Sequence, residues 1–462
     1  MPYPNPYDFV PLENAEPLRV QWSPDTHSVS HYRKDRYSGR IDCILHPETP
    51  IFVHGQGQQN LRKRGFHRIN GRPGIPASSL KGAIRSIYEI VTDGCLSSLS
   101  DSYRGPKRPI KPTEHIPPAY WPCHDLNVVC PGCLLFGMVE QDLPAGQQAR
   151  GLAGRLTFSD ATPVRINYEW RNMPAPGGGP QPRHESFYFD NASDQILGRK
   201  LYFHHRDYQE TIRLYGDGGR PGLMQVELHK GDFAFTIDFV NLTEKELNFL
   251  CYSLLLEDDI RHHLGYGKSY GLGSARIRIQ SISLVCGPGE DASAYFRQLT
   301  PAPPSTVDAQ DFAAKGRAQW LARTGTSVVY NKFKQILAWP GRDLYQYPTY
   351  QWFRRTPGTG TVTLAEYQAG VRRPSSSAQK TTGASPTGKR QQGRVTMFND
   401  QRGFGFIQTD GGESIFVHFS KIRRGGPRRL QVGQRVEFEV HLTSRGPQAW
   451  DVVVLQGGES NG

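Results

Sequence analysis

Apolar residues recur at a helical spacing in two segments of the chain. The first segment follows Ser78 and Ser79 and ends at Val91, with apolar positions at intervals of three and four residues. The second starts at Thr243 and Glu246, which have the spacing of a capping box. The pattern predicts two amphipathic helices, the first capped by serine, and each with one buried face.

Segments with alternating apolar residues or β-branched character flank both helices and are typical of strands. They are Gly39 to Leu45, Gly154 to Ser159, Gln225 to His229, Phe233 to Val240 and Ala275 to Gln280. Their order around the two helices fits a βαββαβ arrangement with long insertions. We therefore expect an α+β domain with a ferredoxin-like (RRM-like) fold.

Five short alternating segments near the carboxyl end predict a second, all-β unit. They are GRVTMF, GFGFIQ, SIFVH, QRVEFEVHL and PQAWDVVVL, joined by turns that are often rich in glycine. Strands this short and closely spaced bury their apolar positions by closing into a small barrel.

The 462 residues exceed what one hydrophobic core usually holds, so several domains are expected. Residues 371–392 are rich in Ser, Thr, Gly and Pro and contain no acidic residue, which is typical of a flexible basic linker. We divide the chain into the α+β domain (1–290), an extension without an assigned role (291–370), this linker, and the barrel (393–462). The many aromatic residues of the extension suit core packing better than base stacking.

The charge balance favours a polyanionic partner. The chain has 55 Lys and Arg against 43 Asp and Glu, a net charge of +12, although a solvated basic surface gives the same count. The start MPYPNPYDF lacks the features of a signal peptide, and the longest apolar run is too short for a bilayer. We therefore expect a cytoplasmic protein whose seven cysteines are reduced thiols or metal ligands.

Aromatic residues occupy every second position in two of the barrel segments, RGFGFIQ and SIFVHF, so their rings project from one surface. Bases stack on such rings with about 1 to 3 kcal/mol each, while nearby cations neutralise phosphates. The alternative is that the rings belong to the barrel core. The candidate nucleic-acid-binding residues of the barrel are Phe398, Arg402, Phe404, Phe406, Phe416, His418 and Phe419.

The segment GRVTMFNDQRGFGFIQTDGGESIFVHFSKI resembles the signature of the cold-shock domain, with both of its ribonucleoprotein motifs. The resemblance extends over residues 393–455 and implies an OB-fold barrel that binds single-stranded nucleic acid. Where that family usually carries Lys-Trp-Phe, this chain has Thr396, Met397 and Phe398. One ring and one cation are missing there, so we expect a weaker site.

Three segments before residue 290 resemble the RAMP superfamily of CRISPR-associated proteins, whose members build ferredoxin-like folds around CRISPR RNA. They are IPASSLKGAIRSIYE (75–89), CPGCLLFG with GRLTFSDA (within 130–161) and RHHLGYGKSYGLGSARI (261–277); the opening PYDFVPL resembles one CRISPR-associated subgroup. The resemblance implies a type III-like antiviral effector subunit whose partners are CRISPR RNA, complementary RNA and other effector subunits. An RNA chaperone would need the cold-shock barrel alone.

The glycine-rich segment suits an anion. Its glycines let backbone amides approach a phosphate, and Lys268 adds a positive charge. A nucleotide-binding P-loop is excluded because His262 stands where that motif needs its first glycine. A tight turn between helix and strand needs some of the same glycines, which are Gly265, Gly267, Gly271 and Gly273.

A long loop from His54 to Gly74 is basic and has no acidic residue, so we expect it to follow RNA phosphates, with Phe66 wedging a base. With Lys81 of the first helix, the predicted RNA-binding residues here are Arg62, Lys63, Arg64, Phe66, His67 and Arg68. The loop resembles the thumb-like loop of RAMP backbone subunits, in which RNA-cutting members carry an aspartate. None is present, and a phosphate contact suits His54 or His67 better than the role of a base, so we expect binding without cleavage. The alternative is an endoribonuclease that processes CRISPR RNA or cleaves target RNA.

Cys123, Cys130 and Cys133 form the metal candidate. A Cys-X-X-Cys pair with a third thiolate and an imidazole satisfies tetrahedral zinc, and the set resembles the Cys3His zinc site of several RAMP proteins. We expect a structural zinc ion, with free thiols as the alternative. His115 is the favoured fourth ligand, because His124 adjoins Cys123 and two adjacent ligands crowd one ion.

Overall fold

The structure is a computed structural model, and it describes most of the α+β domain and of the barrel. The described residues are 5–13, 18–23, 27, 29–55, 63–97, 115–140, 148–174, 187–190, 195–216, 223–290, 297, 305–324, 328–341, 345, 364, 367, 390–399, 404–418, 421–422, 430–443 and 446–455. The predicted linker lies almost entirely outside these residues, and the domain boundaries stay a prediction.

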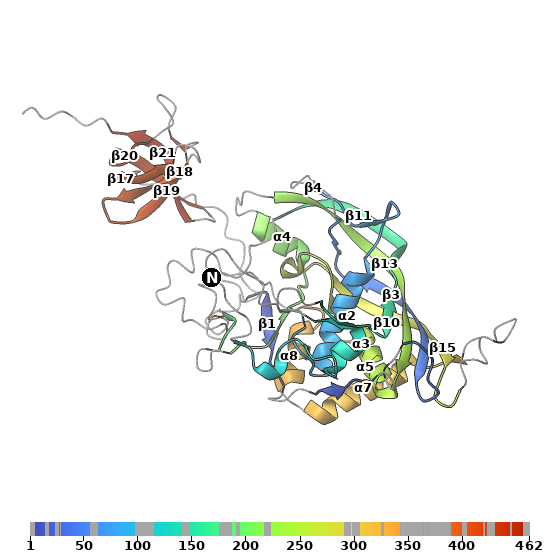
Figure 1. The fold of residues 1–462 in the computed structure, drawn as a ribbon. Coiled ribbons are helices and arrows are strands. Elements are labelled where there is room, and N and C mark those ends of the chain that lie inside the picture. The colour runs from blue at the N-terminus through green and yellow to red at the C-terminus, as the bar shows by residue number, and fades with distance from the viewer. Residues whose placement is uncertain are drawn as a thin grey trace, which may run out of the picture.

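An antiparallel sheet with two helices on one side forms the larger domain (Figure 1). Its strands lie in the order β10-β13-β3-β15, which is the order of a ferredoxin-like βαββαβ fold. The expected fold class is confirmed. In chain order, the core elements are β3 (Tyr37–Pro47), α2 (Ala77–Val91), β10 (Leu156–Phe158), β13 (Leu223–Leu242), α5 (Glu244–Leu255) and β15 (Ser274–Cys286).

Alternation along the strands decides which face of the sheet meets the helices. Ile41, Cys43 and Leu45 of β3 are buried in the core that also holds α2 and α5. The predicted capping box is present, since Thr243 accepts from the Glu246 amide and Glu246 from the Thr243 amide. The predicted serine cap of α2 is wrong. That helix starts at Ala77, with no side-chain bond at its cap, so the two serines lie in its first turn.

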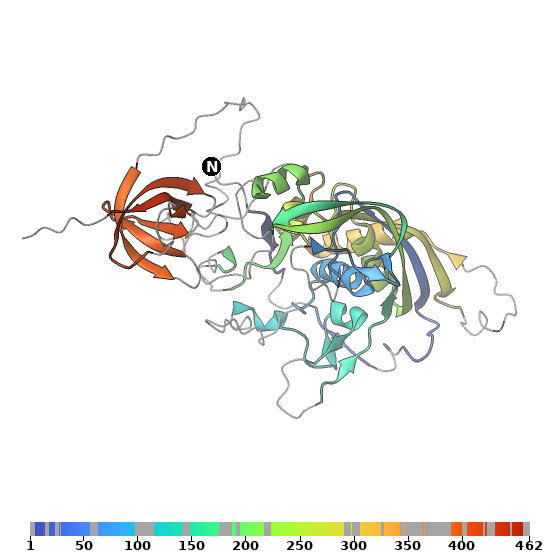
Figure 2. The ribbon, with the colours of Figure 1, turned by 90° about the horizontal axis from the view of Figure 1, so that it is seen from above.

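Two of the predicted strands form one long strand, β13, which pairs with β11 (Thr162–Pro174) beyond the core (Figure 2). Gly231 allows the strand to continue there, because its φ is +111° and an added Cβ would lie 1.9 Å from the Arg165 carbonyl oxygen. Strand β4 (Lys63–Arg64) joins β13 in parallel. We call β4, β11 and residues 223–231 of β13 the arm.

Residues on either side of the core extend the domain. Strand β1 (Tyr7–Val10) pairs with β12 (Arg199–Tyr202), and Leu364 and Tyr367 join the same hydrophobic cluster as Tyr7. Helices α7 (Ala309–Thr324) and α8 (Val328–Leu337) pack on the core through Trp320, which is fully buried. The described aromatic residues of 305–341 therefore serve packing, as expected.

Short elements complete this domain. They are β2 (Val20–Gln21), β5 (Arg68–Ile69), β6 (Arg72–Pro73), η2 (Pro118–Tyr120), β7 (Val128–Val129), α3 (Pro131–Phe136), β8 (Met138–Val139), β9 (Gly151–Leu152), α4 (Tyr208–Gly216), β14 (His262–His263), η4 (Lys268–Tyr270) and β16 (Ser305–Thr306). Within the described parts of the chain, no helix has the length and apolar character needed to cross a membrane.

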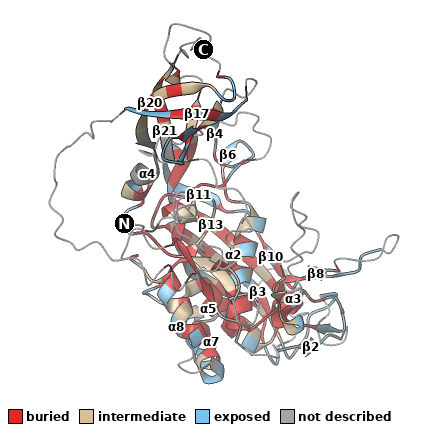
Figure 3. Cartoon of the chain, turned by 90° about the vertical axis from the view of Figure 1, so that its left-hand side faces the viewer, coloured by how far each residue is buried: buried red, intermediate tan, exposed pale blue. Residues whose placement is uncertain are grey.

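The five carboxyl-terminal strands close into a barrel in the order β17-β18-β19-β21-β20, as expected. Its buried core includes Val395, Ile407, Val436 and Phe438. Figure 3 shows buried stretches along the barrel strands. The strands are β17 (Arg390–Asn399), β18 (Phe404–Thr409), β19 (Ser414–His418), β20 (Arg435–Thr443) and β21 (Gly446–Val454).

Candidate nucleic-acid interface and metal site

A groove of about 620 Å³ lies where parts of the chain that are far apart in sequence meet. It is bounded by the first turns of α2, by β12 and by residues 262–268 of the glycine-rich segment. Its polar lining consists of two lysines, three histidines, two tyrosines and three serines, with no carboxylate among the lining residues that the structure describes. They are Lys200, Lys268, His54, His262, His263, Tyr202, Tyr266, Ser78, Ser79 and Ser86.

The glycine-rich segment forms one wall of this groove through a tight turn. All four predicted glycines have φ between +76° and +84°, and a Cβ on Gly273 would lie 1.9 Å from the Leu264 carbonyl oxygen. The Tyr266 amide donates to the Phe52 carbonyl (2.8 Å) and the Gly273 amide to the Pro50 carbonyl (3.0 Å). Because the turn uses many of its own amides, its geometry favours the tight-turn interpretation of these glycines over a phosphate cradle.

Lys268 projects from this turn into the groove, where burial lowers the pKa of its ammonium group. Lys268 is partly buried, and no carboxylate is among the described lining residues of the groove. An anionic ligand offsets the cost of desolvating such a cation. The predicted role of Lys268 therefore has a physical basis in its surroundings.

Sequence analysis missed Lys200 of β12, a second lysine of the groove. Its Nζ lies 3.7 Å from the ring centroid of Tyr7 and donates to the Tyr188 hydroxyl at 3.0 Å. Burial lowers its pKa to about 8, while the tyrosine rings stabilise the charged form. At neutral pH it remains mostly protonated.

The residues of the predicted thumb-like loop do not form one surface. Arg62 lies outside the described residues. Phe66 is fully buried between His229 and Phe233, so the prediction of a base-wedging ring is wrong, because the core takes that ring. His67 makes a backbone contact to Val53 and does not line the groove, whereas His54 does.

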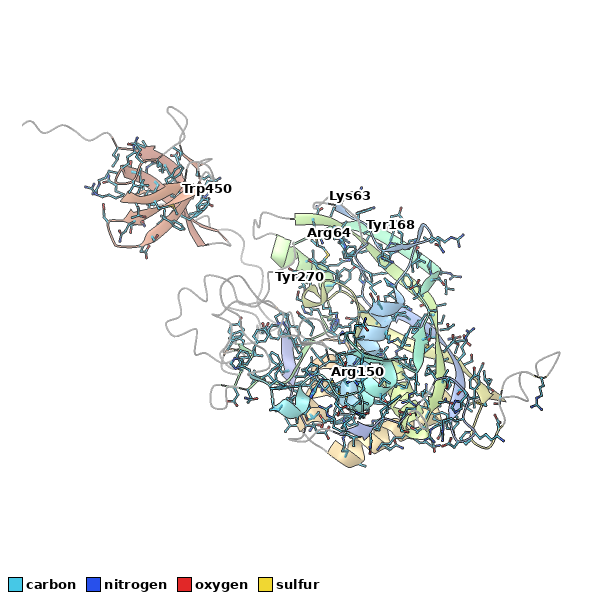
Figure 4. The ribbon with its side chains drawn as sticks, in the orientation of Figure 1. Lys63, Arg64, Arg150, Tyr168, Tyr270 and Trp450 are labelled. Carbon is cyan, nitrogen blue, oxygen red and sulfur yellow. The ribbon has the colours of Figure 1, made fainter. Side chains whose placement is uncertain are left out.

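The remaining predicted cations lie elsewhere. Arg68 donates to both carboxylate oxygens of Glu227, at 2.8 and 3.0 Å. Lys63 and Arg64 belong to the arm (Figure 4). Lys81 borders a different pocket, beside the cysteines, and not the groove.

Four buried cysteines form a cluster in which all sulfur atoms lie within 4.8 Å of one another. Three are the predicted Cys123, Cys130 and Cys133, and the fourth is Cys95, just after α2. The predicted fourth ligand, His115, is not in this cluster; its ring lies 4.4 Å from that of Phe189. Cys95 was missed because one cysteine far from the others in sequence carries no spacing signal.

The cluster fits tetrahedral zinc. Cys95 Sγ lies 3.6 Å from the sulfurs of both Cys130 and Cys133, close to the roughly 3.8 Å that four Zn–S bonds of about 2.3 Å impose. The Cys133 amide donates to Cys130 Sγ at 3.3 Å, which orients that sulfur. Guanidinium groups lie 3.3 Å from two of the sulfurs, Arg19 from Cys123 and Arg85 from Cys133, and balance thiolate charge.

The cysteine cluster is connected to the groove through β12. Arg199 donates to the carbonyl oxygens of Gly94 and Cys95, and it neighbours Lys200 in the chain. It also approaches the buried carboxylate of Glu89 on α2, at 3.9 Å. Whatever holds Cys95 in place therefore also restrains one wall of the groove.

The barrel presents the predicted aromatic surface. Phe404, Phe406 and Phe416 are half-buried, while Ile407 and Val417 beside them are fully buried. The Phe416 ring lies 5.8 Å from that of Phe404 and 5.7 Å from that of Phe406. This arrangement favours the surface interpretation over the core interpretation.

The other predicted barrel residues vary. Phe398 is half-buried against the barrel core, and Met397, at the position of the missing tryptophan, is 40% exposed. Arg402, Phe419 and the side chain of His418 lie outside the described parts. Sequence analysis missed Trp450, over whose ring Lys421 Nζ lies at 2.9 Å (Figure 4).

Comparisons with known proteins agree with both resemblances. A family model described as the RAMP superfamily matches residues 45–276, half of the chain, and one described as the 'Cold-shock' DNA-binding domain matches residues 391–455. The chain is 52% identical over 64 residues to cold shock-like protein CspC of Bacillus cereus, and 49% identical over 65 residues to cold shock protein CspD of Bacillus subtilis. Each match covers 14% of this chain and 98% of the relative. Together the matches support a nucleic-acid-binding role.

Proposed function

The chain belongs to the RAMP superfamily and carries a carboxyl-terminal cold-shock domain, and from this we propose that it holds CRISPR RNA in a type III-like antiviral effector complex. The larger domain binds the guide, and the barrel binds a single strand of target or displaced nucleic acid. Its partners are CRISPR RNA, complementary RNA and other effector subunits.

One observation carries this proposal: the groove has cations and no carboxylate among its described lining residues. Phosphates supply the negative charge that the described lining of the groove does not offer to Lys200 and Lys268. The serines of the first turn of α2 add hydroxyl donors beside them, as phosphate contacts commonly require.

We further propose that the four cysteines hold a structural zinc ion. Bound there, zinc joins the end of α2 to the segment 123–133, a region with only a small hydrophobic cluster of its own. Four cysteine ligands leave no open position, so the ion is assigned a structural and not a catalytic role.

Purification from the native host, followed by sequencing of the bound RNA, tests the guide assignment. We expect repeat-derived guides, and we expect Lys200→Ala combined with Lys268→Ala to reduce their recovery at least tenfold. Lys315→Ala, which removes an exposed lysine of α7, is the matched control and should change nothing. Random cellular RNA in the wild-type preparation would overturn the proposal.

A second candidate function, metal-independent RNA cleavage, is supported by His54 alone of the two histidines considered. His54 lines the groove, which also contains a lysine with a lowered pKa. Incubation with repeat-containing and guide-complementary RNA in EDTA tests it. Discrete products that disappear in His54→Ala and persist in His67→Ala would replace the binding-only function with an endoribonuclease.

A further inference from the structure

The arm carries an exposed aromatic ring outside the groove. Tyr168 of β11 is 63% exposed, and its ring is stacked on that of His229, at 5.6 Å and 22°. The Phe66 ring lies 4.4 Å from His229 and is fully buried. Tyr168 is thus the outer member of a three-ring column anchored in the core.

A buried carboxylate fixes this column. Glu227, whose side chain is 3% exposed, accepts from the Phe66 amide at 3.0 Å and pairs with His229 Nε2 at 2.8 Å. It also accepts two bonds from Arg68. A ring held by such a network loses little conformational entropy when a ligand stacks on it.

Two cations of β4 lie near the exposed ring. Lys63 Nζ lies 4.4 Å from the centroid of the Trp170 ring, two residues from Tyr168 on the same side of β11. Lys63 is exposed, and Arg64 is partly exposed. Figure 4 shows Lys63, Arg64 and Tyr168 close together on the arm.

The arm and the groove share one short segment, residues 50–54. Ile51 exchanges backbone hydrogen bonds with His229, at 2.8 and 2.9 Å, while Val53 and His54 line the groove. A smaller cavity of about 250 Å³ lies between Pro50, Tyr168 and Lys230. A strand that leaves the groove past His54 therefore meets the arm next.

We propose that the arm is a second single-stranded nucleic-acid site, where an unpaired base stacks on Tyr168 while Lys63 and Arg64 contact the adjacent phosphates. The proposal rests on the proposed guide-binding function and extends it beyond the groove. Any base can stack on a tyrosine ring. The site should therefore bind single strands in preference to duplexes, without a preference for sequence.

The test uses the full chain with Phe416→Ala in the barrel, so that the barrel does not mask the arm. Affinity for a single-stranded RNA containing 4-thiouridine is measured for Tyr168→Ala, for Tyr168→Phe and for Val164→Ala. Val164 is the control, because it is 64% exposed on the same strand and offers no ring. Photocrosslinking with peptide mapping is performed on the same samples.

Tyr168→Ala should lower affinity by roughly 5- to 150-fold, the range that a loss of about 1 to 3 kcal/mol gives. Tyr168→Phe and Val164→Ala should stay close to the parent, and crosslinks should map to residues 162–174. Equal affinity of Tyr168→Ala and the parent, without crosslinks to the arm, overturns the proposal. The exposed ring would then be assigned to contact with a protein partner.

Variants of the groove separate the hypothesis of an arm site from the hypothesis of guide binding. If Lys200→Ala with Lys268→Ala weakens RNA binding and Tyr168→Ala does not, the arm proposal alone fails. If Tyr168→Ala weakens binding and the purified protein carries no repeat-derived guide, the guide function fails and the arm remains a single-strand site.

Discussion

The barrel face and the groove proposed to bind the guide are built in opposite ways. The barrel places its rings on two adjacent strands, so that Phe406 and Phe416 are register partners. The groove brings together α2, β12 and the turn before β15, which are far apart in sequence. A site on neighbouring strands survives changes elsewhere in the fold, whereas a site made from distant segments depends on the supports behind each segment.

The largest expected effect concerns one of those supports. Cys95→Ser should abolish the proposed zinc binding and lower the stability of the larger domain by several kcal/mol, because a structural zinc site contributes directly to folding. The unfolding of the barrel should be the same as in the chain without this substitution. Metal content by mass spectrometry and thermal unfolding measure both effects.

His115→Ala is the matched control for this variant, and we expect it to retain one zinc ion per chain. Zinc loss in His115→Ala with retention in Cys95→Ser would reverse the ligand assignment.

Acid should also act on the larger domain first. Burial lowers the pKa of His204 and His205 to about 3 and that of His262 to about 4, so these rings are neutral in the folded protein. Below pH 6.5 the unfolded chain binds more protons than the folded one. Stability is thus complete above that pH and falls toward pH 4, by up to about 1.4 kcal/mol per pH unit for each histidine.

Urea unfolding between pH 7 and pH 4, followed separately for the two domains, measures this difference. His204 has both ring nitrogens within hydrogen-bond distance of Ser274 Oγ and the Arg261 carbonyl, so a neutral tautomer satisfies both. A transition of the larger domain that does not move with pH would contradict the assignment of neutral buried rings.

Removal of the aromatic rings of the barrel should separate single-strand binding by the barrel from guide binding by the larger domain. Phe404→Ala with Phe416→Ala should reduce affinity for single strands by about 1 to 3 kcal/mol per ring and leave guide RNA bound. Deletion of residues 393–462 should give the same pattern. Filter binding and RNA recovery follow the two quantities, and loss of guide RNA on the deletion would make the barrel the principal binding site.

The smallest effect is a gain. Met397→Trp restores the ring that cold-shock domains usually carry at this position, which is 40% exposed. We expect single-strand affinity to rise about fivefold, the equivalent of about 1 kcal/mol. Met397→Leu, which adds no ring, should leave the affinity unchanged.

The spacing of apolar residues along the chain predicted those features of the fold that depend on neighbouring residues. Both helices, the ferredoxin-like order and the barrel with Phe404, Phe406 and Phe416 follow from spacing along the chain. The fourth sulfur and Lys200 depend on contacts between distant segments, for which one sequence offers no signal. Phe66 was predicted wrongly for the opposite reason. Its basic neighbours in sequence suggested an exposed ring, but contacts with distant residues bury the ring in the core.

The packing of Tyr367 bears on how strongly the two sites act together. Tyr367 lies in the cluster that contains Tyr7, whose ring touches Lys200 of the groove. The barrel starts at Arg390, so 23 residues of chain limit its distance from that cluster to roughly 80 Å. Confinement in a sphere of that radius corresponds to an effective concentration on the order of 1 mM. Under the proposed function, the tether therefore gives the barrel a local concentration around a strand bound in the groove that a free cold-shock protein would reach only at the same concentration in solution.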